Sequence, residues 1–193
     1  MGFAELVGYY LKNLANFAGR EERRRFWPGA GLVIVGSMGG MIAAMVPVML
    51  DSFAKVRRFA IEHPDQVTET RGPGSYSVQV HGYHPELMPD IDALVGGMAL
   101  VIAVTVLLLA AAVVRRLHDC GRRGLWGALP LPFLASGLAL MPRLFHMADP
   151  DFSLFALLFA NNLVYIASLV LLVVLLAGRG TPGANRYGPP PAS

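Results

Sequence analysis

Four uncharged, apolar stretches dominate this 193-residue sequence, and they cover residues 29–50, 94–114, 125–141 and 152–177. An α-helix rises 1.5 Å per residue, so about 20 apolar residues cross the roughly 30 Å hydrocarbon core of a bilayer. Each stretch is long enough to cross, or nearly cross, a membrane. The sequence therefore predicts an all-α fold: an integral membrane four-helix bundle in which residues 1–193 form a single membrane domain.

Composition excludes a soluble helical bundle. The chain is 54% hydrophobic and only 15% charged, whereas the outer faces of soluble helices are interrupted by charge about every second turn. The single cysteine, Cys120, cannot form an intrachain disulfide and has no CxxC partner for a zinc or redox site. His81 and His84 lack an ordered carboxylate spacing, so no metal or other cofactor is expected.

The basic residues predict how the chain is oriented. The net charge is +3, but the basic residues lie beside the apolar stretches, which is typical of membrane topology and not of a nucleic-acid-binding protein. Eleven of the 16 Lys and Arg fall before the first span, between spans two and three, and in the tail. Four spans place these segments on one side, which the positive-inside rule makes cytoplasmic, with both termini. Lys55, Arg57 and Arg58 argue against this placement, but they lie in a long connection that also holds acidic residues.

An amphipathic helix is expected before the first span. Its apolar residues follow the spacing of one helical face, and they are Phe3, Leu6, Val7, Tyr10, Leu11 and Leu14. Gly19 is expected to end this helix, and a second helix is expected to start near Glu21. The first helix either packs on the cytoplasmic face of the protein or lies in the headgroup layer as an interfacial helix.

Two segments outside the spans are polar. Residues 51–93 are predicted to form an extramembrane loop, in which Tyr76, Val78 and Val80 alternate with polar residues, a pattern typical of a short strand or hairpin. The tail, residues 179–193, is rich in glycine and proline and is predicted to be flexible.

Small and polar residues inside the spans predict helix contacts. Gly36, Gly40 and Ala44 are spaced by four, which favours close approach of another span of this chain or of a second copy. Pro130 and Pro132 are expected to kink span three or to start it with an irregular turn. Span four contains three polar residues at membrane depth, Asn161, Asn162 and Tyr165. They are expected either to hydrogen-bond to a neighbouring helix or to line a path for a ligand or ion.

Three polar motifs lie on the predicted cytoplasmic side. They are Phe17-Ala18-Gly19-Arg20 with residues 23–27, Arg115-Arg116-Leu117-His118-Asp119-Cys120-Gly121 leading to Gly124-Leu125-Trp126, and Asn185-Arg186-Tyr187-Gly188-Pro189. In this order, and over nearly the whole chain, they resemble the bacterial inner-membrane family called domain of unknown function 805. The chain departs from the family pattern at Arg123-Gly124-Leu125, where Ser-Gly-Trp is common, and in its longer 51–93 connection. The resemblance implies a small multispanning protein of the bacterial inner membrane, and it supplies no agreed activity.

The second motif predicts a charged cluster. If span two stays helical to Cys120, Arg115 and Asp119 lie four apart on one face and Gly121 caps the helix. Asp119 then meets several guanidinium groups, and the candidate set is Arg20, Arg115, Arg116, His118, Asp119, Arg122 and Arg186. These residues predict an internal ion-pair network that docks the N-terminal segment and tail, or a pocket for a phosphate or anionic lipid headgroup. Both can hold at once.

The functional prediction is a non-catalytic membrane protein. Adjacent helical residues point about 100° apart, so His118 and Asp119 do not form an obvious catalytic pair. The expected partners are the lipid bilayer and, at the basic cytoplasmic face, anionic phospholipid headgroups or a protein partner. A homo-oligomer is a further alternative, and no nucleic acid is expected. The alternative is a transporter or channel for an ion or small solute that uses the polar residues of span four.

Overall fold

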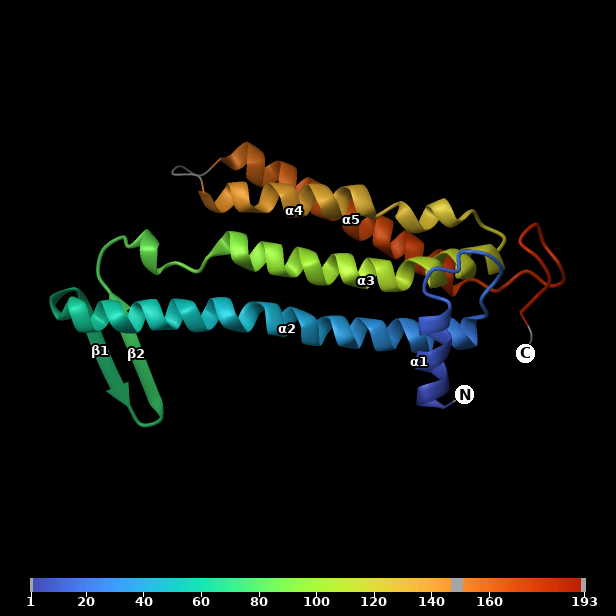
Figure 1. The fold of residues 1–193 in the computed structure, drawn as a ribbon. Coiled ribbons are helices and arrows are strands. Elements are labelled where there is room, and N and C mark those ends of the chain that lie inside the picture. The colour runs from blue at the N-terminus through green and yellow to red at the C-terminus, as the bar shows by residue number, and fades with distance from the viewer. Residues whose placement is uncertain (1, 147–150, 192–193) are drawn as a thin grey trace.

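The computed structural model describes residues 2–146 and 151–191, and it is mostly helical (Figure 1). Its elements, in chain order, are α1 (Phe3–Lys12), α2 (Arg23–Glu62), the 3₁₀ helix η1 (Pro64–Gln66), β1 (Val67–Gly72), β2 (Ser75–Val80), η2 (Pro85–Leu87), α3 (Ile91–Asp119), η3 (Gly124–Ala128), α4 (Leu131–His146) and α5 (Phe152–Ala177). The predicted all-α class is confirmed, with one small two-stranded sheet.

The helix α3 lies between the other long helices. It packs along α2 on one side and against η3, α4 and α5 on the other. Figure 1 shows the amino end of α2, the carboxyl ends of α3 and α5, and both chain termini at one end of the molecule, hereafter the terminal end. The β1–β2 hairpin projects from the opposite end, hereafter the loop end.

The helices bury little of their apolar surface against each other. Among the described residues, four helical segments are long and apolar enough to cross a membrane, and at most 17% of the most apolar window of any of them is buried. Val35, Leu107 and Val174 are each more than 60% exposed. Surfaces of this kind need an apolar solvent, so the four helices fit a multi-pass membrane protein.

The helix of the first span continues into the predicted loop. Residues 51–62 were expected to belong to the loop, but α2 continues through them to Glu62. The Asp51–Lys55 pair, with 2.7 Å between Oδ2 and Nζ, supports the extra turns, and the next helix breaker is Pro64. The polar connection therefore covers residues 63–90. Its predicted hairpin is confirmed: β1 and β2 pair antiparallel, and Pro73 and Gly74 form the turn.

Two other boundaries also differ. The expected start of span three at residue 125 is the 3₁₀ helix η3, and a regular helix begins only at Leu131 and runs past residue 141 to His146. This is the irregular start that the prolines predict. The first helix, α1, ends at Lys12 and not at Gly19, because the side-chain amide of Asn13 donates to the Tyr9 carbonyl over 2.9 Å and caps the helix.

Small residues join α2 to α3 as predicted for spans of one chain. A β-carbon on Gly40 would lie 3.1 Å from Val101, and one on Gly97 would lie 3.2 Å from the β-carbon of Ala44. Gly36 is different, because a β-carbon there would meet no atom within 4 Å. The Gly40 and Ala44 positions are thus where these two helices approach closely.

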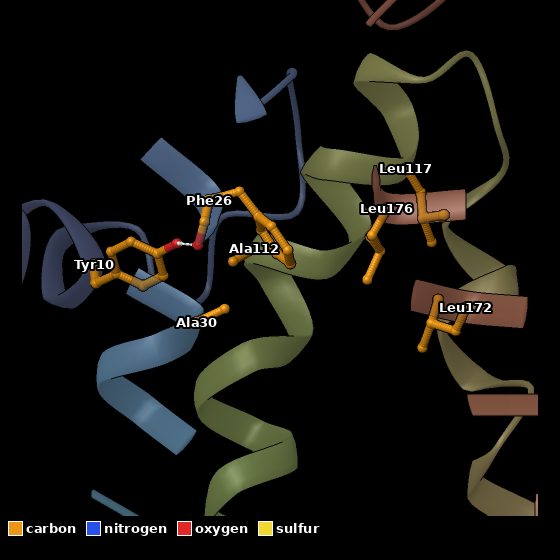
Figure 2. Packing of buried hydrophobic residues seen from close by; sticks show 7 residues of the cluster. All are labelled: Tyr10, Phe26, Ala30, Ala112, Leu117, Leu172 and Leu176. Carbon is orange, nitrogen blue, oxygen red and sulfur yellow. Dashed lines mark hydrogen bonds between the residues drawn. The ribbon is translucent and has the colours of Figure 1, made fainter. Parts of the chain in front are cut away.

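The buried apolar cluster lies near the terminal end (Figure 2). It joins α1, α2, α3 and α5 through Tyr10, Phe26, Ala30, Ala112, Leu117, Leu172 and Leu176. Figure 2 shows the Tyr10 hydroxyl donating to the Phe26 carbonyl, over 3.0 Å. This cluster supports the polar contacts that lie beside it.

Candidate functional site

The three polar motifs meet where α3 ends. The amide of Arg122 donates to the Leu117 carbonyl, and the amide of Gly121 donates to the His118 carbonyl, which together form a Schellman cap. Gly121 has φ +70°, a conformation that favours glycine. The predicted cap is therefore present, and the chain turns back at this point.

Arg116 is the centre of the contacts at this turn. Its side chain is fully buried. The Nε atom donates to the Leu176 carbonyl and Nη2 donates to the Gly178 carbonyl, both in the segment that ends α5. Nη1 donates to the Asp119 carboxylate and to the Glu21 carbonyl. One guanidinium thus joins α3, the end of α5 and the N-terminal segment.

Arg20 joins the N-terminal segment to the tail. Its Nε donates to Asp119 Oδ1 over 3.0 Å, and its Nη1 and Nη2 donate to the carbonyls of Gly183 and Thr181, each over 2.7 Å. The amide of Thr181 in turn donates to the Asp119 carbonyl. The Asp119 carboxylate is therefore shared by Arg20 and Arg116, and residues of the tail predicted to be flexible are hydrogen-bonded to the turn.

Arg115 pairs with Glu21 and not with Asp119, although Arg115 and Asp119 lie four apart on α3 as expected. Its Nε and Nη2 donate to Glu21 Oε2 over 2.9 and 2.6 Å, and its Nη1 donates to the carbonyls of Asn13 and Asn16. The amide of Glu21 donates to the Arg115 carbonyl. The N-terminal segment therefore folds along α3 and brings in a carboxylate from far away in the sequence.

Glu21 is the site residue that the sequence reading missed. It is 1% exposed, and its Oε1 has no hydrogen-bond partner among the described residues. Burial raises the pKa of this carboxyl, and the Arg115 guanidinium opposes that rise. The available signal was that Glu21 is one of very few acidic residues in a strongly basic segment.

His118 and Tyr187 join the second and third motifs. Their rings are stacked, with centroids 3.7 Å apart, and His118 Nδ1 donates to the Gly19 carbonyl over 3.2 Å. The side-chain amide of Asn185 donates to the His118 carbonyl over 3.0 Å. Arg186 is exposed and lies over the Tyr187 ring. Each motif therefore contributes residues to one junction.

We define the arginine cluster as Arg20, Arg115, Arg116, Glu21 and Asp119. All five side chains are buried. In each of the three guanidiniums, Nε, Nη1 and Nη2 all donate to acceptors inside the protein. The arrangement therefore acts as an internal ion-pair network that holds the N-terminal segment, α3 and the tail together.

A second set of basic residues surrounds this cluster on the surface. Its members are exposed and form no ion pair with the described residues, and they are Lys12, Arg23, Arg24, Arg122, Arg123 and Arg179. The sequence grouped Arg122 and Arg186 with the buried arginines, but both are exposed. Arg122 belongs to this second set, whereas Arg186 donates to the Gly121 carbonyl and lies over the Tyr187 ring. Sequence alone could not separate the two sets, because burial depends on how the N-terminal segment folds back.

The polar residues of span four lie apart from this junction. The Asn161 side chain accepts from Ser136 Oγ over 2.7 Å and donates to the Phe133 carbonyl over 2.9 Å, which joins α5 to α4. Asn162 and Tyr165 line a cavity of about 300 Å³ between the same two helices. The cluster and these residues are thus two separate polar sites.

Comparison with known proteins identifies the family. No curated protein and no solved structure matches the chain. The family model described as "Protein of unknown function (DUF805)" matches residues 14–189, nearly the whole chain and all three motifs. The chain therefore belongs to the DUF805 family.

Proposed function

We propose that this protein is a non-catalytic component of the bacterial inner membrane, with its terminal end in the cytoplasm, where exposed arginines bind anionic phospholipid headgroups. The observation that carries the proposal is the division of the basic residues into two sets. The buried arginines have internal partners, whereas the exposed set has none among the described residues. Exposed guanidiniums at a membrane surface attract anionic lipids by about 1 kcal/mol each.

The distribution of charge along the molecule supports the cytoplasmic placement. Eleven of the 16 Lys and Arg belong to segments at the terminal end. The loop end instead carries a mixture of both signs, as in the pairs Asp51–Lys55 and Glu69–Arg71. An excess of Lys and Arg close to the spans is what the positive-inside rule associates with the cytoplasm.

The position of α1 supports contact with headgroups. Figure 1 shows α1 crossing the start of α2 at the terminal end, instead of running along it. Phe3 and Leu11 are more than 60% exposed, as expected for an interfacial helix. Between α1 and α2 lies a hollow of about 330 Å³ that is lined by Leu6, Glu22, Arg24, Arg25 and Pro28. A headgroup in this hollow would meet two guanidiniums and one carboxylate, which leaves an excess of positive charge beside an apolar helix.

The geometry of His118 and Asp119 supports a non-catalytic role. Asp119 already accepts from two guanidiniums, and His118 donates to a carbonyl and stacks on Tyr187. Neither side chain is placed to activate the other. The transport alternative draws less support, because the Asn161 amide is already bonded to α4.

The proposal is tested by lipid selectivity. Native mass spectrometry of the purified protein measures retained phosphatidylglycerol and phosphatidylcholine at equal supply. We expect preferential retention of phosphatidylglycerol, which falls in each of the double variants R23Q/R24Q and R122Q/R123Q and weakens with added salt. The matched control is R57Q/R58Q, which removes two exposed arginines at the loop end. Equal retention of the two lipids by the wild type would overturn the proposal, and binding of an acidic protein instead would assign this face to a protein partner.

A further inference from the structure

An apolar groove opens beside the exposed arginines. It has a volume of about 520 Å³ and is lined by α3, η3, the start of α4 and the second half of α5. Apart from Thr105 and Tyr165, every lining residue is apolar or glycine. The Thr105 hydroxyl already donates to the Val101 carbonyl. The size is that of a small-molecule site, about 300–1,000 Å³, and such an apolar cavity does not hold water well.

The groove exists because of how η3 is held against α3. A β-carbon on Gly124 would lie 2.7 Å from Val114, and one on Gly127 would lie 2.9 Å from Val113, so the two segments are in close contact there. Beyond this contact, Pro130 interrupts the helical path before α4 begins at Leu131. A continuous helix does not cover this part of α3, and the space between α3, α4 and α5 stays open.

The length of the groove fits one leaflet. Its lining on α3 runs from Thr105 to Val114. Nine residue steps at 1.5 Å give about 14 Å, and one leaflet contributes roughly 15 Å of hydrocarbon. The groove starts near the terminal end, where α3 turns at Gly121, and extends toward the middle of the spans. An acyl chain entering at the membrane surface would lie along it.

Two exposed arginines lie next to the groove in the chain. Arg122 and Arg123 immediately precede Gly124, the first lining residue of η3, and both are exposed without an ion pair among the described residues. Leu125 and Trp126 follow, 78% and 40% exposed. This order matches the parts of an anionic phospholipid. The arginines correspond to the phosphate, Trp126 to the interfacial region, and the apolar groove to an acyl chain.

We infer that this groove is a phospholipid site: one acyl chain lies between α3, α4 and α5, and the phosphate lies against Arg122 and Arg123. The inference rests on the proposed binding of anionic headgroups at the terminal end, and it gives that function a defined site. Binding there would hold one lipid in a fixed position, whereas the other exposed arginines bind headgroups of freely exchanging lipids.

The test fills the groove without touching the arginines. Ala110 lines the groove, whereas Ala103 lies on the same helix, is exposed and is outside the lining. A110F should weaken phosphatidylglycerol binding to the full chain about tenfold in native mass spectrometry, because a benzyl group occupies the space of the chain. A103F should bind as the wild type does. R122Q/R123Q should also weaken binding about tenfold, through loss of two charges at the phosphate.

The two proposals fail in different ways. Unchanged retention in A110F, with retention lowered by R122Q/R123Q, would overturn the groove and leave headgroup binding in place. Equal retention of phosphatidylglycerol and phosphatidylcholine by the wild type would overturn both. A second measurement uses the wild-type protein. Phosphatidylglycerol with a photoactivatable acyl chain should label residues 106–114 and 131–134 in higher yield than the exposed residues of α2. Labelling spread evenly over the four helices would contradict the site.

Discussion

The Tyr10 ring occupies the position that a side chain on Gly29 would need. Tyr10 is held there by its hydrogen bond to the Phe26 carbonyl, and a β-carbon built on Gly29 overlaps the ring. This contact is one point at which α1 is attached to α2. The absence of a side chain at residue 29 is thus part of how the N-terminal helix is positioned.

Gly29→Ala should detach α1. The new methyl displaces Tyr10, and overpacking of this kind costs about 1–3 kcal/mol. Thermal unfolding in detergent should show a lower midpoint, and protease should cut residues 13–19 faster. Gly31→Ala is the matched control, since a β-carbon there meets no atom within 4 Å. Equal midpoints for the two variants would show that the Tyr10 contact is unimportant.

Arg116→Gln and Arg122→Gln should differ strongly in stability. Arg116 is buried and shares Asp119 with Arg20, so its loss removes one of the two guanidiniums from a buried carboxylate and removes the guanidinium donor from the Leu176 and Gly178 carbonyls, at a cost of about 3–5 kcal/mol. Arg122 is exposed, so its loss should change the free energy of unfolding by less than about 0.5 kcal/mol. Thermal unfolding in the same detergent compares them, and similar losses would contradict the division into buried and exposed sets.

Tyr187→Ala should loosen the tail without unfolding the spans. It removes the stacking on His118, a contact worth about 0.5–1.5 kcal/mol, while the bonds from Arg20 to Thr181 and Gly183 remain. We expect trypsin to cut after Arg186 several-fold faster, with an unchanged melting midpoint. Tyr187→Phe keeps the ring and should behave as the wild type. A tail cut at the same rate in all three proteins would rule out a role for the stacked rings.

The start of α5 should respond to acid. Asp151 accepts from the Ser153 hydroxyl and from the amides of Ser153 and Leu154, and these bonds lower the pKa of its carboxyl below the ordinary 3.8. Because the pKa is lowered in the folded state, the ionised carboxylate stabilises the start of α5 above pH 3.8. This stabilisation is lost as the pH falls through the folded-state pKa. The amides of Ser153 and Leu154 should therefore lose protection from hydrogen exchange as the pH falls through the folded-state pKa of Asp151.

Asp151→Asn provides the control for this pH dependence. Asparagine caps helices about as well as aspartate but does not titrate in this range. Protection in the variant should stay constant relative to an internal amide of α5. If the variant and the wild type lose protection over the same pH interval, Asp151 is not the responsible group.

The spans could be predicted because the length of an uncharged, hydrophobic run is enough to identify a membrane helix. An uncharged run of about 20 residues has few alternatives to a membrane helix, and residues 152–177 coincide with α5. The continuation of α2 to Glu62 is not predicted, because residues 51–62 include five charged side chains and hydrophobicity alone ends the span at Leu50. Helix ends outside the membrane depend on breakers and on pairs such as Asp51–Lys55, which hydrophobicity does not report.

The arginine cluster could be predicted only in part. The motifs placed Arg20, Arg116 and Asp119 on one side of the membrane, and they do meet. The pairing of Arg115 with Glu21 joins residues 94 apart in the sequence, so no local spacing encodes it. Arg115 and Arg116 are neighbours, but helix geometry sends their side chains to different partners.

The bonds of Arg20 also have a consequence for biosynthesis. Its acceptors Thr181 and Gly183 come more than 160 residues later. At about 5–20 residues per second, a ribosome needs roughly 10–30 s to reach them. During that interval the N-terminal segment is complete while its final partners do not yet exist. The bonds of Arg20 must therefore form after α5 has been made, when the segment that follows α5 closes over residues made first.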